Sequence, residues 1–120
     1  MKAVKIKKNG GPEVLEVEEI TLRKPAKNEV LIEHVAIGLN YIDTYHRSGL
    51  YPLMMPSGLG MEASGIIKEV GSDVSNFVVG DRVAYAAVPL GAYSSHRIYK
   101  TQNLVKVPKE IDLNIAAAIM

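Results

Sequence analysis

The sequence predicts a mainly β domain, either a small barrel or a sandwich. The chain has 120 residues, which suits a single domain. Its composition, with 48% hydrophobic and 22% charged residues, is typical of a globular protein. Runs of alternating or β-branched residues recur about every ten residues, separated by Gly and Pro turn signals, as in small all-β folds. Together these features favour short strands over long helices.

Strands are predicted wherever apolar residues alternate with polar ones or β-branched residues gather. In the first strand, Val4 and Ile6 alternate with Lys5 and Lys7, the period-two pattern of a half-buried strand. The run from 29 to 40 has a mixed pattern that predicts burial on both faces for part of its length. The predicted strands are 2–8, 14–20, 29–40, 62–71, 81–88, 92–100 and 103–107.

Two short helices complete the predicted fold. Residues 40–47 are expected to form one or two helical turns, and the Gly and Pro residues from 49 to 56 exclude regular structure until about residue 62. Asp112 is the expected N-cap of an alanine-rich helix over 113–120. Because this helix has no capping Gly or Asn before Met120, we expect the chain to be the front piece of a longer protein, with the apolar face of the helix exposed.

Composition excludes several classes of function. The chain has 14 Lys and Arg against 13 Asp and Glu, and cations cluster only at Lys2, Lys5, Lys7 and Lys8, where a strand turns them to solvent. A nucleic-acid surface needs a larger basic patch, so no nucleic-acid partner is predicted. Without cysteine the chain has no disulfide, no thiolate zinc site and no Cys nucleophile.

No membrane association is predicted either. No segment approaches the roughly 18 consecutive apolar residues that a spanning helix needs. The first residues, MKAVKIKKNG, lack the apolar stretch of a signal peptide and continue directly into a strand pattern. The sequence therefore predicts a cytoplasmic protein.

Gly58, Gly60 and Ala63 match the G-x-G-x-x-G/A spacing of dinucleotide-binding loops. Such a loop functions between a strand and a helix, whereas this segment follows Pro56 and Ser57 and precedes a β-branched stretch. We therefore reject a dinucleotide site here. The glycines are expected to let a loop pass close to a neighbouring segment or a ligand.

The histidines His34, His46 and His96 show no ligand-like spacing and are predicted to be ordinary surface or strand residues. Ser94 and Ser95 precede His96, but successive residues of a strand point to opposite faces. No Ser–His pair is therefore expected, and a nucleophilic hydrolase is not favoured.

The segment from Asn40 to Tyr45 is the main candidate site. It follows a predicted buried strand and places Asn40, Asp43 and Thr44 on about one helical turn. One interpretation is a capped connector, in which these polar groups satisfy the local backbone. The other is the floor of a ligand site, because an amide and hydroxyls fix a polar ligand while Tyr45 and Tyr51 offer flat faces with hydrogen-bonding tips.

Several motifs in consistent order extend over the whole chain. They are Asn9–Leu15, Gly38–Pro52, Pro56–Gly65, Val70–Gly71, Val79–Val83 and Gly91–Ser94. With these motifs the chain resembles the medium-chain dehydrogenase/reductase superfamily, in particular its zinc-free, NADPH-dependent quinone oxidoreductases, the zeta-crystallin-like group.

The resemblance implies a GroES-like, partly open β-barrel with short helices over residues 1–120. In this family such a catalytic domain precedes a Rossmann domain that holds NADPH, and this chain stops at the start of the connecting helix. In the whole protein, a hydride would pass from NADPH to a quinone in the cleft between the two domains. The family also implies a homodimer.

The resemblance assigns roles to individual residues as well. Asn40, Tyr45 and Tyr51 would be catalytic residues that line the quinone pocket. A flat, uncharged quinone suits stacking on tyrosine and hydrogen bonds to its carbonyls. The residues implied to contact the nicotinamide side of the cofactor are Tyr41, Ile42, Asp43, Thr44 and Tyr45.

No metal site is expected. Zinc-dependent members of the superfamily have Cys at the position of Asn40 and His at the position of Met61, and here only the adjoining Glu62 remains. An amide, a thioether and one carboxylate do not make a Zn²⁺ site, and the four-Cys structural zinc lobe is also missing. The resemblance therefore points to reduction without a metal.

Residue types do not separate a quinone reductase from an enoyl or alkenal reductase of the same superfamily, because both substrates are flat carbonyl compounds. A non-catalytic barrel with a binding or structural role is the alternative from another class. In either enzymatic interpretation we expect these 120 residues alone to be inactive, because they supply only one wall of the cleft.

Overall fold

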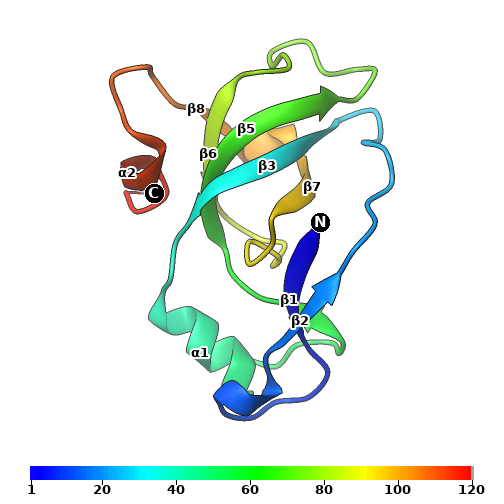
Figure 1. The fold of residues 1–120 in the computed structure, drawn as a ribbon, viewed down its shortest axis with the longest axis vertical. Coiled ribbons are helices and arrows are strands. Elements are labelled where there is room, and N and C mark those ends of the chain that lie inside the picture. The colour runs from blue at the N-terminus through cyan, green and yellow to red at the C-terminus, as the bar shows by residue number, and fades with distance from the viewer. Residues whose placement is uncertain (120) are drawn as a thin grey trace.

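The computed structural model describes residues 1–119 and confirms a mainly β chain with short helices (Figure 1). The elements in chain order are β1 (Lys2–Ile6), the 3₁₀ turn η1 (Pro12–Val14), β2 (Glu16–Glu19), β3 (Glu29–Ile37), α1 (Tyr41–Ser48), β4 (Ser57–Gly58), β5 (Glu62–Val70), β6 (Arg82–Ala86), β7 (His96–Lys100), the 3₁₀ turn η2 (Thr101–Asn103), β8 (Val105–Lys106) and α2 (Leu113–Ala116). One sheet has the order β2-β1-β4 and the other the order β7-β3-β5-β6-β8. The two sheets do not close into a barrel.

The larger sheet is built on the long antiparallel pair β3 and β5. Its register shifts twice, between Leu31 and Ile32 and between His34 and Ala36. Such irregularities bend a strand and increase its twist. At the second shift, Gly65 of β5 faces the main chain of β3 so closely that a Cβ there would overlap the Glu33 carbonyl oxygen. The sequence of β5 therefore permits the tight curvature of this pair.

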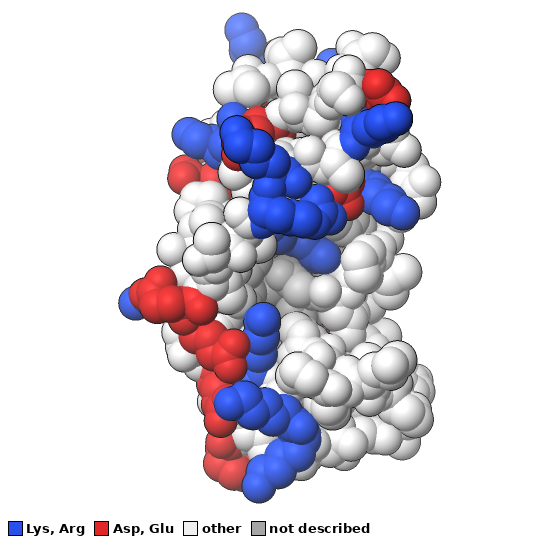
Figure 2. Space-filling model, turned by 90° about the vertical axis from the view of Figure 1, so that its right-hand side faces the viewer, with Lys and Arg blue, Asp and Glu red and all other residues white. Residues whose placement is uncertain are grey.

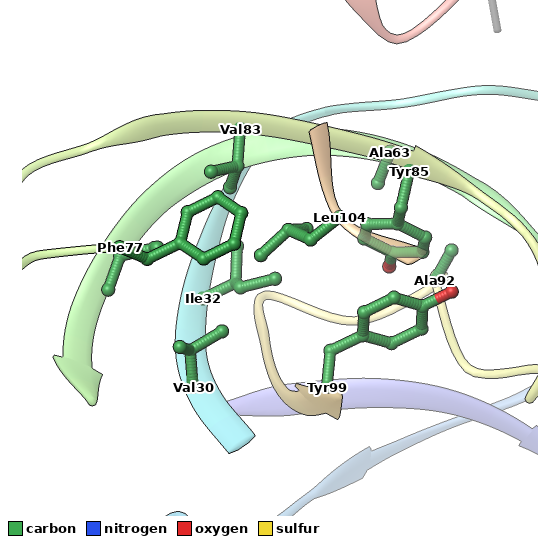
Figure 3. Packing of buried hydrophobic residues seen from close by; sticks show 10 residues of the cluster. Val30, Ile32, Ala63, Phe77, Val83, Tyr85, Ala92, Tyr99 and Leu104 are labelled. Carbon is green, nitrogen blue, oxygen red and sulfur yellow. The ribbon is translucent and has the colours of Figure 1, made fainter. Parts of the chain in front are cut away.

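The main core lies on the concave side of this sheet (Figure 3). Tyr85 and Tyr99 stack at its centre, with ring centroids 4.2 Å apart. Aromatic pairs at this spacing add to the free energy gained by burying apolar area. Burial on both faces of β3 is confirmed for its first half only, because Val35 and Ile37 are exposed. The core residues are Val30, Ile32, Ala63, Ile67, Phe77, Val83, Tyr85, Ala92, Tyr99 and Leu104.

The smaller sheet carries the amino-terminal lysines. β1 and β2 pair antiparallel, so lysines of one strand face glutamates of the other. Figure 2 shows a row of acidic side chains beside basic ones at the lower left of the molecule. The lysines point to solvent, as expected, and three of them pair with glutamates. The ion pairs are Lys2–Glu19, Lys5–Glu18 and Lys7–Glu16.

Main-chain hydrogen bonds join the two sheets where β1 passes the segment before β7. Val4 N donates to Tyr93 O at 2.8 Å, and Ser95 N donates to Lys2 O at 2.8 Å. The predicted strand 92–100 therefore begins only at His96, because the residues before it turn around Gly91, whose φ is +142°. A second correction concerns the predicted irregular stretch up to residue 62, in which Ser57–Gly58 pairs with β1.

The carboxyl-terminal segment packs on β5 and β6. Ser64 Oγ donates to Leu113 O at 2.5 Å, and Arg82 donates to Pro108 O and Ile111 O at 2.6 Å. Asp112 is the N-cap of α2, as expected, and accepts a hydrogen bond from Asn114 N at 2.7 Å.

The expected helix over 113–120 is shorter in the structure. α2 ends at Ala116, and Met120 lies outside the described residues. The apolar residues from 113 to 119 are only partly exposed. Leu113, Ala116 and Ala117 are buried, whereas Ile115 and Ile119 are exposed. No helix within residues 1–119 has the length and apolar character needed to cross a membrane.

Candidate functional site

Asn40 lies at the start of α1, directly beside the first residue of β5. Its side-chain Nδ2 donates to Glu62 Oε1 at 3.0 Å. Glu62 is only 7% exposed, and a Cβ at Gly38 would overlap its carboxylate. Gly38 therefore makes room for Glu62, and Glu62 orients the amide of Asn40, which is itself exposed.

Asp43 points inward from α1 and fixes the helix to the rest of the chain. Its Oδ2 accepts hydrogen bonds from Asn40 N at 3.1 Å and from Tyr93 Oη at 2.5 Å, and the side chain is 3% exposed. Burial, and next the bond to Asp43, raise the pKa of Tyr93. Thr44 Oγ1 donates to Tyr41 O at 2.6 Å. These local bonds are the ones that the capped-connector interpretation predicts.

Tyr45 and Tyr51 lie together at the carboxyl end of α1. Their ring centroids are 5.6 Å apart in an edge-to-face arrangement. The helix ends at Gly49, whose φ of +93° is left-handed, and both Gly49 N and Tyr51 N donate to Tyr45 O. This turn brings Tyr51 back against Tyr45.

The predicted site residues are therefore neighbours on one end of the molecule, where α1 lies in Figure 1. Leu39, Leu50 and Met54 extend this exposed surface with apolar side chains. The predicted site residues differ in exposure. Ile42 and Thr44 are half-buried, and Asp43 is buried. The exposed ones are Asn40, Tyr41, Tyr45 and Tyr51.

Sequence reasoning missed a buried polar network behind the larger sheet. His34 Nδ1 lies 2.8 Å from Ser94 O, and His34 Nε2 lies 2.9 Å from Tyr85 Oη. Arg97 Nη1 donates to the same hydroxyl at 3.3 Å. Burial lowers the pKa of His34 to about 4, with a smaller contribution from the charge of Arg97. No sequence signal links these residues, because they come from three different strands.

Two expectations about histidine and serine are wrong. His46 was expected on the surface or on a strand, but it lies on the inner face of α1 and is 9% exposed. The second correction is a Ser–His contact, because Ser95 Oγ lies 2.9 Å from His96 Nδ1. His96 Nε2 lies 3.1 Å from Glu33 Oε2. Ser95 sits in a bend before β7, so strand alternation does not apply to it.

Within residues 1–119, no three His, Cys, Asp or Glu side chains gather in an arrangement that could hold a metal ion. The glycine segment 58–63 leads through Gly60, with φ +91°, into strand β5 and not into a helix. Gly58 lies against Gly91, and a Cβ on Gly58 would be 3.2 Å from Gly91 Cα. The segment therefore lacks the following helix that a dinucleotide loop requires, and the expected close approach of a neighbouring segment is confirmed.

The alcohol dehydrogenase GroES-like domain is the family whose model matches this chain, over residues 26–109. The chain belongs to this family. Helix α1 and Glu62, which bonds Asn40, therefore lie within a GroES-like domain. The mainly β fold and the family resemblance expected from sequence are both confirmed.

Several proteins to which the chain is similar bear the names of reductases or oxidoreductases. The chain is 54% identical over 112 residues to a quinone oxidoreductase of Pseudomonas aeruginosa, covering 92% of this chain and 34% of the relative. It is 43% identical over 116 residues to a 2-haloacrylate reductase of a Burkholderia species, covering 93% of this chain and 35% of that relative. The crystal structure of Escherichia coli quinone oxidoreductase complexed with NADPH superimposes with a TM-score of 0.97 at 48% identity, covering 100% of this chain and 37% of that one. The chain thus spans about a third of the length of these relatives.

Proposed function

We propose that this GroES-like domain forms the substrate side of an NADPH-dependent reductase that transfers a hydride to a quinone without a metal. The observation that carries the proposal is that α1 presents the exposed amide of Asn40, oriented by the buried Glu62, at its start and the tyrosine pair Tyr45 and Tyr51 at its carboxyl end. The similarity to quinone oxidoreductases, one of them solved with NADPH, supports it. The cofactor supplies the hydride, and a Rossmann domain outside these residues would hold most of it.

In this proposal, each exposed group of the site has a separate task. Glu62 uses one N–H of the Asn40 amide, which leaves the second N–H to donate to a quinone carbonyl. Tyr45 and Tyr51 present a hydroxyl-bearing aromatic wall against which a flat ring packs. Tyr41, Ile42, Thr44 and Tyr45 are proposed to face the nicotinamide. Asp43, which is buried, is proposed to support the nicotinamide contact by holding α1 in place.

Oxidation of NADPH, followed by absorbance, tests the proposal in the whole protein that carries this chain. With a benzoquinone as acceptor, Asn40→Ala is expected to lower kcat/KM about tenfold or more, since a group that stabilises developing charge is lost. The matched control is Asn76→Ala, an exposed asparagine in the loop before β6, which should leave kcat/KM unchanged. If the benzoquinone does not stimulate NADPH oxidation, the quinone assignment is wrong.

The second candidate is reduction of a conjugated C=C bond, favoured by the 43% identity to a 2-haloacrylate reductase. An α,β-unsaturated ketone in the same assay separates the two, because a faster reaction with the ketone assigns the enone class. If NADPH is oxidised neither with the quinone nor with the ketone, the non-catalytic alternative is supported.

Two further expectations remain proposals. The whole protein is proposed to be a homodimer. Light scattering after size-exclusion chromatography tests this proposal by measuring the molar mass of the protein in solution. A cytoplasmic location remains a prediction from sequence, and cell fractionation tests it.

A further inference from the structure

A cavity of about 530 Å³ opens between β1 and the segment that leads into β7, away from α1. None of the predicted site residues lines it. Its volume lies within the range of small-molecule sites, ~300–1,000 Å³. We call it the Arg97 cavity, and its wall includes Val4, Lys5, Leu22, Arg23, Gly91 and Arg97.

Arg97 is the most deeply buried cation of that wall, with only 8% of its surface exposed. Its guanidinium lies over the rings of Tyr85 and Tyr99, at 5.4 and 4.8 Å from the centroids. Gly91 packs closely against it, since a Cβ on Gly91 would be 3.3 Å from Arg97 Cζ. The side chain is therefore held in one place, at the cavity.

Every hydrogen-bond partner of Arg97 is electrically neutral. Nη2 donates to Pro89 O at 3.0 Å and to Leu90 O at 3.4 Å, and Nη1 donates to Tyr85 Oη. His34 Nδ1–H must donate to Ser94 O, because a carbonyl only accepts, so neutral His34 accepts at Nε2 from the Tyr85 hydroxyl. Burial raises the pKa of Tyr85 to about 12 and lowers that of His34 to about 4, which keeps both neutral. The positive charge of Arg97 is thus left without a counter-charge in this network.

The other cations of the wall all have a carboxylate. Lys5 lies 4.0 Å from Glu18, and Arg23 lies 2.6 Å from Glu29. The imidazole of His96, which is charged only when protonated, lies 3.1 Å from Glu33. The remaining acid of the wall, Glu19, pairs with Lys2 and the amino terminus. Among residues 1–119, no carboxylate lies within ion-pair distance of Arg97. A buried charge without a counter-charge is costly, so an anion bound in the cavity beside Arg97 would lower the free energy of the folded state.

We propose that the Arg97 cavity is a binding site for a small organic carboxylate with an apolar body. One unpaired cation fits a single negative charge, and a guanidinium pairs well with the planar carboxylate group. The apolar body follows from the rest of the wall, which includes Ala3, Val4, Ile20, Leu22, Leu90 and Ile98. This site is independent of the proposed reductase function.

Benzoate and benzamide test the proposal on the 120-residue chain, because they share a ring and differ in charge. In ¹H–¹⁵N NMR titrations, benzoate is expected to shift the signals of Gly91, His96 and the Arg97 Nε–H group to saturation, and to bind about tenfold more tightly than benzamide or better. Arg97→Met should remove this preference. Arg23→Met, which changes a paired cation of the same wall, should keep it.

Equal binding of benzoate and benzamide would overturn the proposal, as would a benzoate preference that survives in Arg97→Met. Tighter binding of inorganic phosphate than of benzoate would contradict the assignment of a monoanion with an apolar body. Should Arg97→Met fail to fold, the unsubstituted chain decides, because saturable shifts away from Gly91 and Arg97 would place the ligand elsewhere.

Discussion

His34 is held neutral by its surroundings, which couples its titration to folding. Its pKa falls from the usual 6.5 to about 4, mainly through burial. The neutral ring accepts the hydrogen bond of Tyr85 at Nε2, and a proton there would break this bond beside the charge of Arg97. His34 of β3 thus contacts both β6, through Tyr85, and the segment before β7, through Ser94.

This arrangement predicts a loss of stability in mild acid. Between about pH 6.5 and pH 4 the unfolded chain binds a proton at His34 that the folded chain does not, so stability falls as the pH falls. The loss attributable to this residue is about 3 kcal/mol at the lower limit. Urea unfolding across this window should show a weaker pH dependence for His34→Gln than for the unsubstituted chain.

The control variant is His96→Gln, which changes an imidazole that lies beside Glu33 and outside the His34–Tyr85–Arg97 network. It should keep the dependence of the parent chain. Identical pH profiles for His34→Gln and the parent would show that the buried imidazole does not couple to folding.

At the scale of elements, α1 is attached to the β structure by a few specific bonds. Arg47 Nε donates to Gly10 O at 3.2 Å, Gly10 N donates to Arg47 O at 3.0 Å, and Tyr93 donates to Asp43. Asp43 Oδ1 and His46 Nδ1 are buried without a partner. The position of the helix, and with it of Asn40, therefore depends strongly on the bond from Tyr93.

Tyr93→Phe is predicted to lower the free energy of unfolding by about 2 kcal/mol, because it removes one donor from a buried carboxylate. The matched control, Tyr99→Phe, removes a hydroxyl that donates to the neutral carbonyls of Ala87 and Val88, and should cost about 1 kcal/mol. In NMR spectra, the side-chain amide signals of Asn40 should move in Tyr93→Phe and stay in Tyr99→Phe. Equal costs and an unmoved Asn40 would refute this role of Tyr93.

At the scale of the whole molecule, the exposed site around α1 is one wall and not an enclosed pocket. Hydride transfer depends on holding the nicotinamide against the acceptor, which an open surface does poorly. The one glycine motif of the chain leads into strand β5, so the described residues offer no dinucleotide loop.

We therefore predict that the 120-residue chain alone shows weak or undetectable NADPH binding by calorimetry. It should also show no quinone-dependent NADPH oxidation above background. Protein purified without a His tag should contain no stoichiometric zinc by elemental analysis. Submillimolar NADPH binding would mean that the cofactor site is misplaced, and one zinc per chain would contradict the zinc-free assignment.

The sequence by itself determined the main strands and the position of α1, which begins after Asn40 and ends at Gly49. These are local properties, since alternation sets the strands and Gly49 turns the chain so that Tyr51 meets Tyr45. The motifs around α1 also determined the family.

Only the tertiary structure decided what lies behind these elements. Asp43 reads as a polar helix residue, yet its burial depends on Tyr93, fifty positions away. Ser95 meets His96 because Ser95 lies in a bend outside β7, and Arg97 lines a cavity whose wall includes residues of β1 from the other sheet. Local patterns specify which face a residue presents, whereas the partner on that face comes from pairing between distant strands, which no short segment encodes.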